Sequence, residues 1–178
     1  MNNNNITHKM FLSLMIPFIL STITQPLLGA ADIAVVGKLN NVNYISGVSI
    51  GTLIFNTIYW IFGFLRVSTT AFSAQSSHYS DKKRVSDIFF RPIMIALFIS
   101  LIMVIFQNII FESSMKFIKP ELEIEKAAIT YFKILIWGAP FVLTNYVLLG
   151  WLMGLGNIKA SMTMQISGNL LKIILDII

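Results

Sequence analysis

The stretch MFLSLMIPFILSTITQPLLGAADIAVVG occupies residues 10–37 and decides the fold class of this 178-residue chain. Asp32 is the only charged residue between Lys9 and Lys38. A helix of this length spans about 42 Å, which exceeds the roughly 30 Å hydrocarbon core of a bilayer. The stretch therefore predicts a long transmembrane helix that tilts or kinks. Pro26 is the predicted hinge, because proline removes a backbone N–H and clashes with the preceding turn.

The composition also indicates a membrane protein. Charged residues make up 12% of the chain and hydrophobic residues 56%, whereas a soluble domain carries about 25% charged residues. The net charge of +5 comes mostly from basic residues between the apolar runs. That pattern predicts contact with lipid headgroups rather than with nucleic acid. The absence of cysteine excludes disulfides and thiolate metal sites.

Further apolar runs follow, and together they predict an all-α polytopic transmembrane helix bundle of about five helices. We expect a disordered polar leader at residues 1–9 and a bundle at 10–178. The first run is much longer than the apolar region of a signal peptide, which favours a retained helix. The last run is still apolar at Ile178, which suggests a fragment. The predicted helices are 10–37, 45–75, 92–111, 127–149 and a truncated 160–178.

The connections set the expected orientation. His78–Arg91 and Glu112–Lys126 are predicted to be polar loops, part of the second as an interfacial helix, and Pro92 is expected in the first turn of the third helix. Basic residues are modestly enriched on the side that holds the leader and the loop at 78–91. The positive-inside rule then places the N-terminus in the cytoplasm of a multi-pass plasma (inner) membrane protein.

Asp32 is the first candidate functional residue. A carboxylate at the centre of a membrane helix costs about 2.5–3.5 kcal/mol on insertion scales. One interpretation is that Asp32 faces a water-filled cavity, where it takes up a proton or holds a cation. The alternative is that Asp32 lies near the outer interface, close to Lys38, where a carboxylate is tolerated.

Three polar residues form a stripe on the predicted fifth helix. Asn169 lies one turn before Lys172, and Lys172 and Asp176 have i, i+4 spacing. The stripe either lines the same cavity as Asp32, or Lys172 and Asp176 simply neutralise each other as an intrahelical pair. We find no nucleophile elbow, phosphate-binding glycine loop or zinc motif, so we expect neither an enzyme nor a cofactor or metal.

Several motifs resemble a known family. Residues 16–17, 24–32 and 36–37 (Ile-Pro, Thr-Gln-Pro-Leu-Leu-Gly-Ala-Ala-Asp and Val-Gly) resemble the first helix of multidrug and toxic compound extrusion (MATE) transporters. The DinF-like branch is the most similar. Residues 64–70 and 74–75 (Phe-Leu-Arg-Val-Ser-Thr-Thr and Ala-Gln) resemble the end of that family's second helix, and 150–159 resembles its connection between helices four and five.

The resemblance implies a twelve-helix fold of two six-helix lobes, of which this chain would be most of the N-terminal lobe and would lack the C-terminal lobe. It implies a cation-coupled multidrug antiporter that exports small, amphipathic organic cations. By resemblance, Asp32 binds the coupling proton or sodium ion, Pro26 bends in response, and Asp176 and Asn169 join the cation site. Lys172 stands where the family often has asparagine, and its positive charge favours proton over sodium coupling.

Two other functions remain open. A lipid-linked flippase of the same superfamily would need a more basic cavity, for which Arg66 and Lys172 are the basic candidates. The second alternative is a non-transporting membrane fragment or subunit, which the interruption of the last helix in mid-span would explain.

Overall fold

The computed structural model describes most of the chain from residue 41 onward and parts of the first helix. Side chains at 82–85 and 176–177 are not described, although the backbone there is helical. The described residues are Ile16, Ile19, Ile23, 29–31, 33–38, 41–76 and 82–177.

Every regular element among the described residues is helical, which confirms the predicted all-α fold. Three described stretches are long and apolar enough to cross a membrane: Val42–Gln75, Ser86–Ile105 and Leu122–Gly154. The elements in order are α2 (Val42–Ile61), α3 (Phe64–Ser76), α4 (Lys82–Ile105), α5 (Gln107–Ile118), α6 (Leu122–Leu135), the 3-10 turn η1 (Ile136–Gly138), α7 (Ala139–Gly154) and α8 (Ile158–Ile177).

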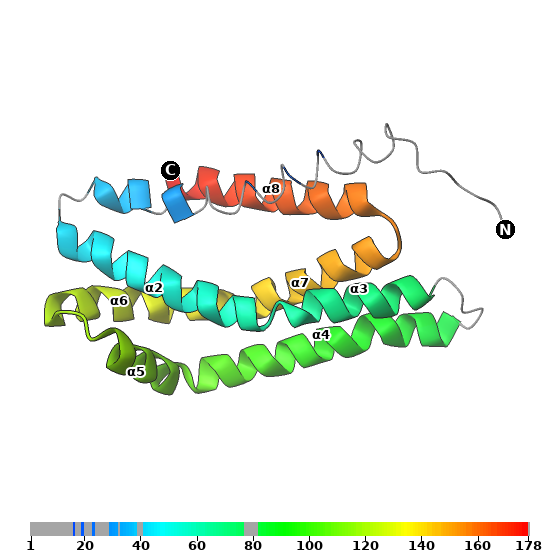
Figure 1. Ribbon diagram of the computed structural model, residues 1–178, viewed down its shortest axis with the longest axis horizontal. Coiled ribbons are helices and arrows are strands. Elements are labelled where there is room, and N and C mark those ends of the chain that lie inside the picture. The colour runs from blue at the N-terminus through cyan, green and yellow to red at the C-terminus, as the bar shows by residue number, and fades with distance from the viewer. Residues whose placement is uncertain are drawn as a thin grey trace.

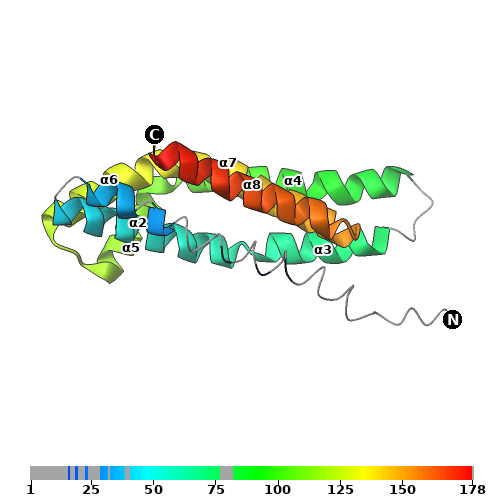
Figure 2. The same ribbon diagram turned by 90° about the horizontal axis from the view of Figure 1, so that it is seen from above.

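The helices run roughly along one long axis (Figures 1 and 2). In the body of the bundle, α3 packs on α7, α2 packs on α6, and α4 packs on both α7 and α3. Helix α8 touches α7 and forms an upper layer together with the described part of the first helix (Figure 1).

The second predicted helix is broken in its middle, which the sequence did not predict. Helix α2 ends at Ile61 and α3 begins at Phe64. At the break, the Gly63 N–H bonds to the Trp60 carbonyl at 3.1 Å, an i→i−3 turn in place of the α-helical pattern. Gly63 favours a break because glycine is a poor helix former.

The prediction of a loop up to Arg91 is wrong, since α4 begins at Lys82 and contains Pro92 in its interior. Lysine and arginine are good helix formers, and an i, i+4 ion pair joins Arg91 Nη2 to Asp87 Oδ2 at 3.0 Å. The predicted loop at 112–126 is also mostly helical. It holds the end of α5 and the start of α6, separated near Lys119, whose φ of 50° is left-handed and which precedes Pro120.

The fourth predicted helix is interrupted as well. Helix α6 ends at Leu135, η1 follows, and α7 begins with Pro140 in its first turn. Proline lacks an N–H and its ring clashes with the carbonyl four residues earlier, here that of Ile136. The α-helical pattern therefore tightens to 3-10 directly before Pro140.

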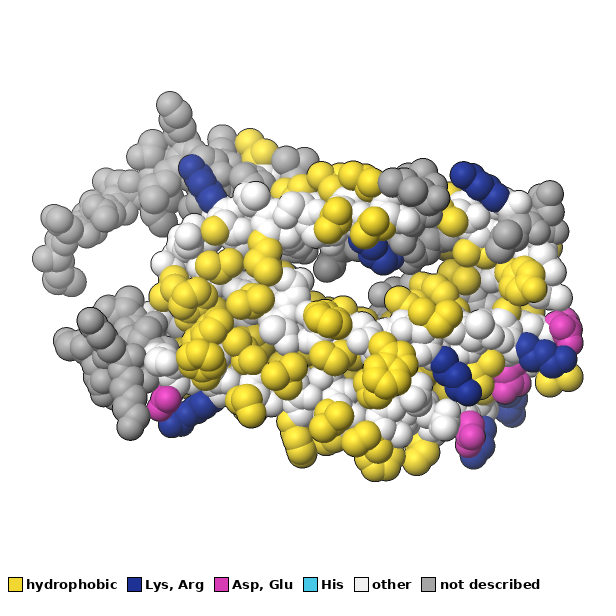
Figure 3. Space-filling view, turned by 180° about the vertical axis from the view of Figure 1, so that it is seen from behind, with side chains coloured by type: hydrophobic (Ala, Val, Ile, Leu, Met, Phe, Trp, Pro, Cys, Tyr) yellow, Lys and Arg dark blue, Asp and Glu magenta, His cyan; other side chains and the backbone are white. Residues whose placement is uncertain are grey.

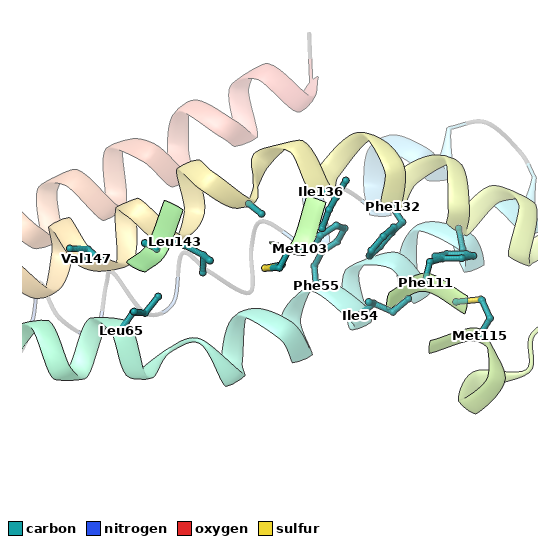
Figure 4. Close-up of a cluster of buried hydrophobic side chains, with 13 residues drawn as sticks. Ile54, Phe55, Leu65, Met103, Phe111, Met115, Phe132, Ile136, Leu143 and Val147 are labelled. Carbon is teal, nitrogen blue, oxygen red and sulfur yellow. The ribbon is translucent and has the colours of Figure 1, made fainter. Parts of the chain in front are cut away.

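A buried apolar cluster holds the two interrupted helices together (Figure 4). The Phe132 ring lies 4.9 Å from Phe55 and 5.4 Å from Phe111, measured between centroids. Leu143 and Val147 continue the cluster along α7 toward Leu65 of α3. The core thus fixes α2 and α3 against α6 and α7.

Helices α3 and α7 approach closely because α7 has glycine where they meet. A Cβ on Gly150 would lie 2.5 Å from the Arg66 carbonyl oxygen, and one on Gly154 would collide with the Thr70 carbonyl and with Ser73. Ser73 Oγ donates to the Trp151 carbonyl at 2.9 Å across the same contact. Small residues permit such backbone approach between membrane helices.

We predict that Gly150→Ala and Gly154→Ala each destabilise the protein by about 1–3 kcal/mol, because the added methyl meets backbone. Gly168→Ala is the matched control, since nothing lies within 4 Å of a Cβ there. It should be neutral or stabilising by up to about 1 kcal/mol. Thermal unfolding of the protein in detergent measures all three, and equal losses in Gly154→Ala and Gly168→Ala would contradict the packing.

Candidate functional site

A cavity of about 590 Å³ lies between the upper layer and the body of the bundle. Figure 3 shows the surface hollowed between these layers. Helices α2, α6, α7 and α8 all contribute to its wall, and Gly29 contributes from the first helix. The remaining lining residues are Thr52, Phe55, Asn56, Tyr59, Trp60, Tyr131, Leu135, Gly138, Val142, Asn145, Tyr146, Asn169 and Lys172.

Polar side chains interrupt the largely apolar wall of this cavity. Hydroxyl and amide side chains come from α2, α6, α7 and α8, and Lys172 is the one charged side chain among the described lining residues. Phe55 and Trp60 add aromatic surface from α2. The cavity can therefore offer hydrogen bonds, ring faces and one positive charge to a bound molecule.

Helical spacing explains how each helix presents several residues to the cavity. On α2, Thr52 and Asn56 are four residues apart, which places both on one face of the helix. Asn169 and Lys172 of α8 have the i, i+3 spacing that has the same effect.

One polar contact joins α2 to α6 at the wall. Thr52 Oγ1 and Tyr131 Oη lie 3.4 Å apart, and either can donate. Gly51 makes this approach possible, because a Cβ there would lie 2.5 Å from Tyr131 Cδ1. The neighbouring wall is attached to the core, since Tyr59 stacks on Phe55 at 5.6 Å between ring centroids and Phe55 stacks on Phe132.

The structure brings together two of the residues singled out from the sequence: Asn169 and Lys172 both line the cavity. Asp32 and Pro26 lie outside the described residues. Asp176 falls within α8, but its side chain is not described. The cation-coupling role of these residues stays a prediction.

Arg66, the other basic candidate, does not line the cavity. Its Nη2 lies 3.3 Å from Met153 Sδ, in the contact between α3 and α7. Within the described part of the chain, no three His, Asp or Glu side chains gather as they would around a metal ion.

Sequence reasoning centred on charged residues and missed most of the cavity wall, including Thr52, Tyr131, Asn145 and Tyr146. A usable signal was present: Asn56 and Asn145 are amides inside long apolar spans, where unpaired polar groups are costly. Both residues line the cavity, although Asn56 is exposed and Asn145 is half-buried.

Long apolar helices around a cavity with several polar lining residues are those of a helical membrane protein. Residues 17–178 match the MatE family, and the chain belongs to this family. This confirms the resemblance drawn from the sequence motifs.

A relative and a solved structure agree with this assignment. The chain is 31% identical over 164 residues to DNA damage-inducible protein F of Escherichia coli (strain K12), covering 92% of this chain and 36% of that protein. Its fold is similar to that of a MOP superfamily transporter from Pyrococcus furiosus Vc1 (DSM3638), with a TM-score of 0.79 and 24% identity. That likeness covers 93% of this chain and 36% of the transporter chain.

Proposed function

We propose that this chain forms part of a cation-coupled exporter that carries small amphipathic molecules across a membrane by alternating access. The observation that carries the proposal is a cavity between candidate membrane spans, lined by amide, hydroxyl and aromatic side chains. Its 590 Å³ volume falls within the roughly 300–1,000 Å³ typical of small-molecule sites. Membership of the MatE family supports transport rather than enzymatic chemistry.

The cavity wall suits an amphipathic organic cation. Phe55, Tyr59 and Trp60 present ring surface from α2, and ring faces attract cations. Asn145 and Asn169 supply amides from α7 and α8 for hydrogen bonds that orient the polar part of the substrate. The Lys172 ammonium repels a cation, so a cationic substrate would have to bind at the aromatic part of the wall, away from Lys172.

Asp32 is the proposed carrier of the coupling cation, with Pro26 as hinge and with Asp176 and Asn169 as neighbours. Support comes from Gly29, one helical turn before Asp32 in the sequence, and from Asn169, because both line the cavity. A coupling ion drives transport only if its affinity differs between the two states of the cavity. A carboxylate whose hydration changes as the cavity changes sides would have that property.

Lys172 favours a proton over sodium as the coupling ion. It lines the cavity, and an ammonium group offers no oxygen ligand. A sodium ion needs several oxygen ligands. At a separation of about 4 Å, the Lys172 ammonium would repel a bound sodium ion by about 4 kcal/mol at an effective dielectric near 20. A proton needs only one carboxylate.

Lys172 also supports a second candidate function, translocation of a lipid-linked anionic substrate. A phosphate group would find one positive charge and several hydroxyl donors in the wall. Arg66 would not contribute, since it does not line the cavity. A transport assay in vesicles that contain the protein distinguishes the two functions. A flippase would translocate a fluorescent pyrophosphate-linked lipid and would not transport organic cations.

We predict that Asp32→Asn, in the protein expressed with its complete reading frame, reduces pH-driven efflux of a fluorescent organic cation from vesicles at least about tenfold. The asparagine keeps the size of the side chain but cannot take up the proton. Glu123→Gln is the control, because Glu123 is an exposed carboxylate that pairs with Lys126 at 2.8 Å in the first turn of α6. It should transport normally, and full activity in Asp32→Asn would refute the coupling role.

We further predict that a sodium gradient at constant pH drives no efflux in the unmodified protein. Lys172→Asn should make sodium-driven efflux measurable, because it removes a positive charge and supplies an oxygen ligand. Lys159→Asn removes an exposed lysine at the start of the same helix and should change nothing. Sodium-driven efflux by the unmodified protein would overturn the ion assignment.

A further inference from the structure

We propose that a groove between α3 and α4 binds an anionic phospholipid from the surrounding bilayer. The groove has a volume of about 490 Å³ and shares no residue with the transport cavity. Its floor is apolar, formed by Phe72 of α3 and by Ile88, Pro92 and Ile95 of α4. Its rim is polar, formed by Gln75, Asp87 and Arg91.

The groove lies at the depth where a phospholipid changes from acyl chain to headgroup. Gln75 is the last residue of one candidate span, and Asp87 and Arg91 lie in the first turns of the next, Ser86–Ile105. Phe72 and Ile95 lie further inside the spans, yet their side chains are 56% and 50% exposed. One molecule with an apolar tail and a charged head would cover both parts of the groove.

The sequence at this end of the bundle is rich in basic residues, which favours an anionic headgroup. Helix α4 begins with Lys82, Lys83 and Arg84, and Arg91 follows at the groove. Clusters of basic residues at the end of a membrane helix attract anionic lipids by about 1 kcal/mol, or about fivefold in affinity, per residue. Figure 3 shows that charged side chains gather mostly at the ends of the bundle, with hydrophobic side chains between them.

Arg91 is the residue suited to contact the lipid phosphate. Its side chain is 77% exposed, and its one described hydrogen bond runs from Nη2 to Asp87 Oδ2 at 3.0 Å. A guanidinium carries five donors in a planar fork, so this pair leaves donors for a bidentate contact with phosphate. The Asp87 carboxylate at the same rim repels an anionic headgroup. Removing its charge should therefore have the opposite effect on lipid binding to removing that of Arg91.

Native mass spectrometry of the full chain in detergent, titrated with phosphatidylglycerol, phosphatidylethanolamine or phosphatidylcholine, tests the proposal. We expect phosphatidylglycerol to be retained at severalfold higher occupancy than the other two. Arg91→Gln should weaken its apparent affinity about fivefold, by removing one basic residue. Asp87→Asn should strengthen it by a similar factor.

Lys126→Gln is the matched control, because Lys126 also forms an exposed ion pair but lies outside the groove. It should leave phosphatidylglycerol binding unchanged, and equal unfolding temperatures would show that all the variants fold. Equal retention of the three lipids, or an unchanged affinity in Arg91→Gln, would overturn the proposal. Glycerol phosphate, which has no acyl chain, should not displace the lipid. Complete displacement would show that the site binds phosphate without using the apolar floor, and it would also overturn the proposal.

Discussion

Polar groups within apolar membrane spans must find partners inside the protein, because lipid tails supply none. Hydroxyls on these helices bond to carbonyls of their own helix, to carbonyls of a neighbouring helix, as Ser73 does to Trp151, or to another side chain. Ser49, Thr57 and Ser100 bond to carbonyls of their own helix at 2.8 Å. Thr52 instead meets Tyr131 across the cavity wall. Asn56, Asn145, Asn169 and Lys172 line one cavity, to which α2, α7 and α8 all contribute.

The two helix interruptions fit the same constraint. Trp60 lies in the last turn of α2 before the break, Gly138 belongs to the 3-10 turn before α7, and both residues line the cavity. Irregular backbone at membrane depth is tolerated where it is buried in protein or borders a water-filled space. The cavity thus lies where both long spans change direction. A change in either bend would alter its shape, which is what alternating access requires.

The close contact of α3 with α7 fixes the position of α7, which contributes to the cavity wall. Gly150 and Gly154 bring the two backbones together on the half of the bundle beyond the breaks, while Phe55, Phe132 and Ile136 hold the other half. Helix α8 packs on α7 alone among its principal contacts in the described structure. Since α8 carries Asn169 and Lys172 and packs mainly on α7, a shift of α8 would change the shape of the cavity.

Much of the fold could be predicted because long apolar runs have few alternatives to membrane helices. The helix bounds were harder to predict, since charge does not distinguish an exposed helix from a loop. Lys82 to Arg91 is charged and helical, and its helix depends on local pairing such as Asp87 with Arg91. The breaks near Gly63 and Pro140 depend on local backbone geometry.

For the site, the polar stripe singled out in the sequence includes Asn169 and Lys172, which both line the cavity, while its relation to Asp32 stays a prediction. It gave no indication of Thr52 or Tyr131, which are ordinary residues in a membrane helix until the packing of α2 on α6 places them together. A wall assembled from neutral residues of several helices is a property of the tertiary structure. Sequence spacing within one helix cannot reveal it.

The central claim is that the polar cavity is open to water while the helices around it are packed. Because the chain has no native cysteine, single cysteines report on this directly. Asn145→Cys places a thiol in the cavity wall, and Leu143→Cys places one on the same helix in the fully buried core. A small membrane-impermeant thiol reagent should modify the first much faster than the second, and a saturating organic cation should slow that modification. Equal rates at the two positions would contradict the account.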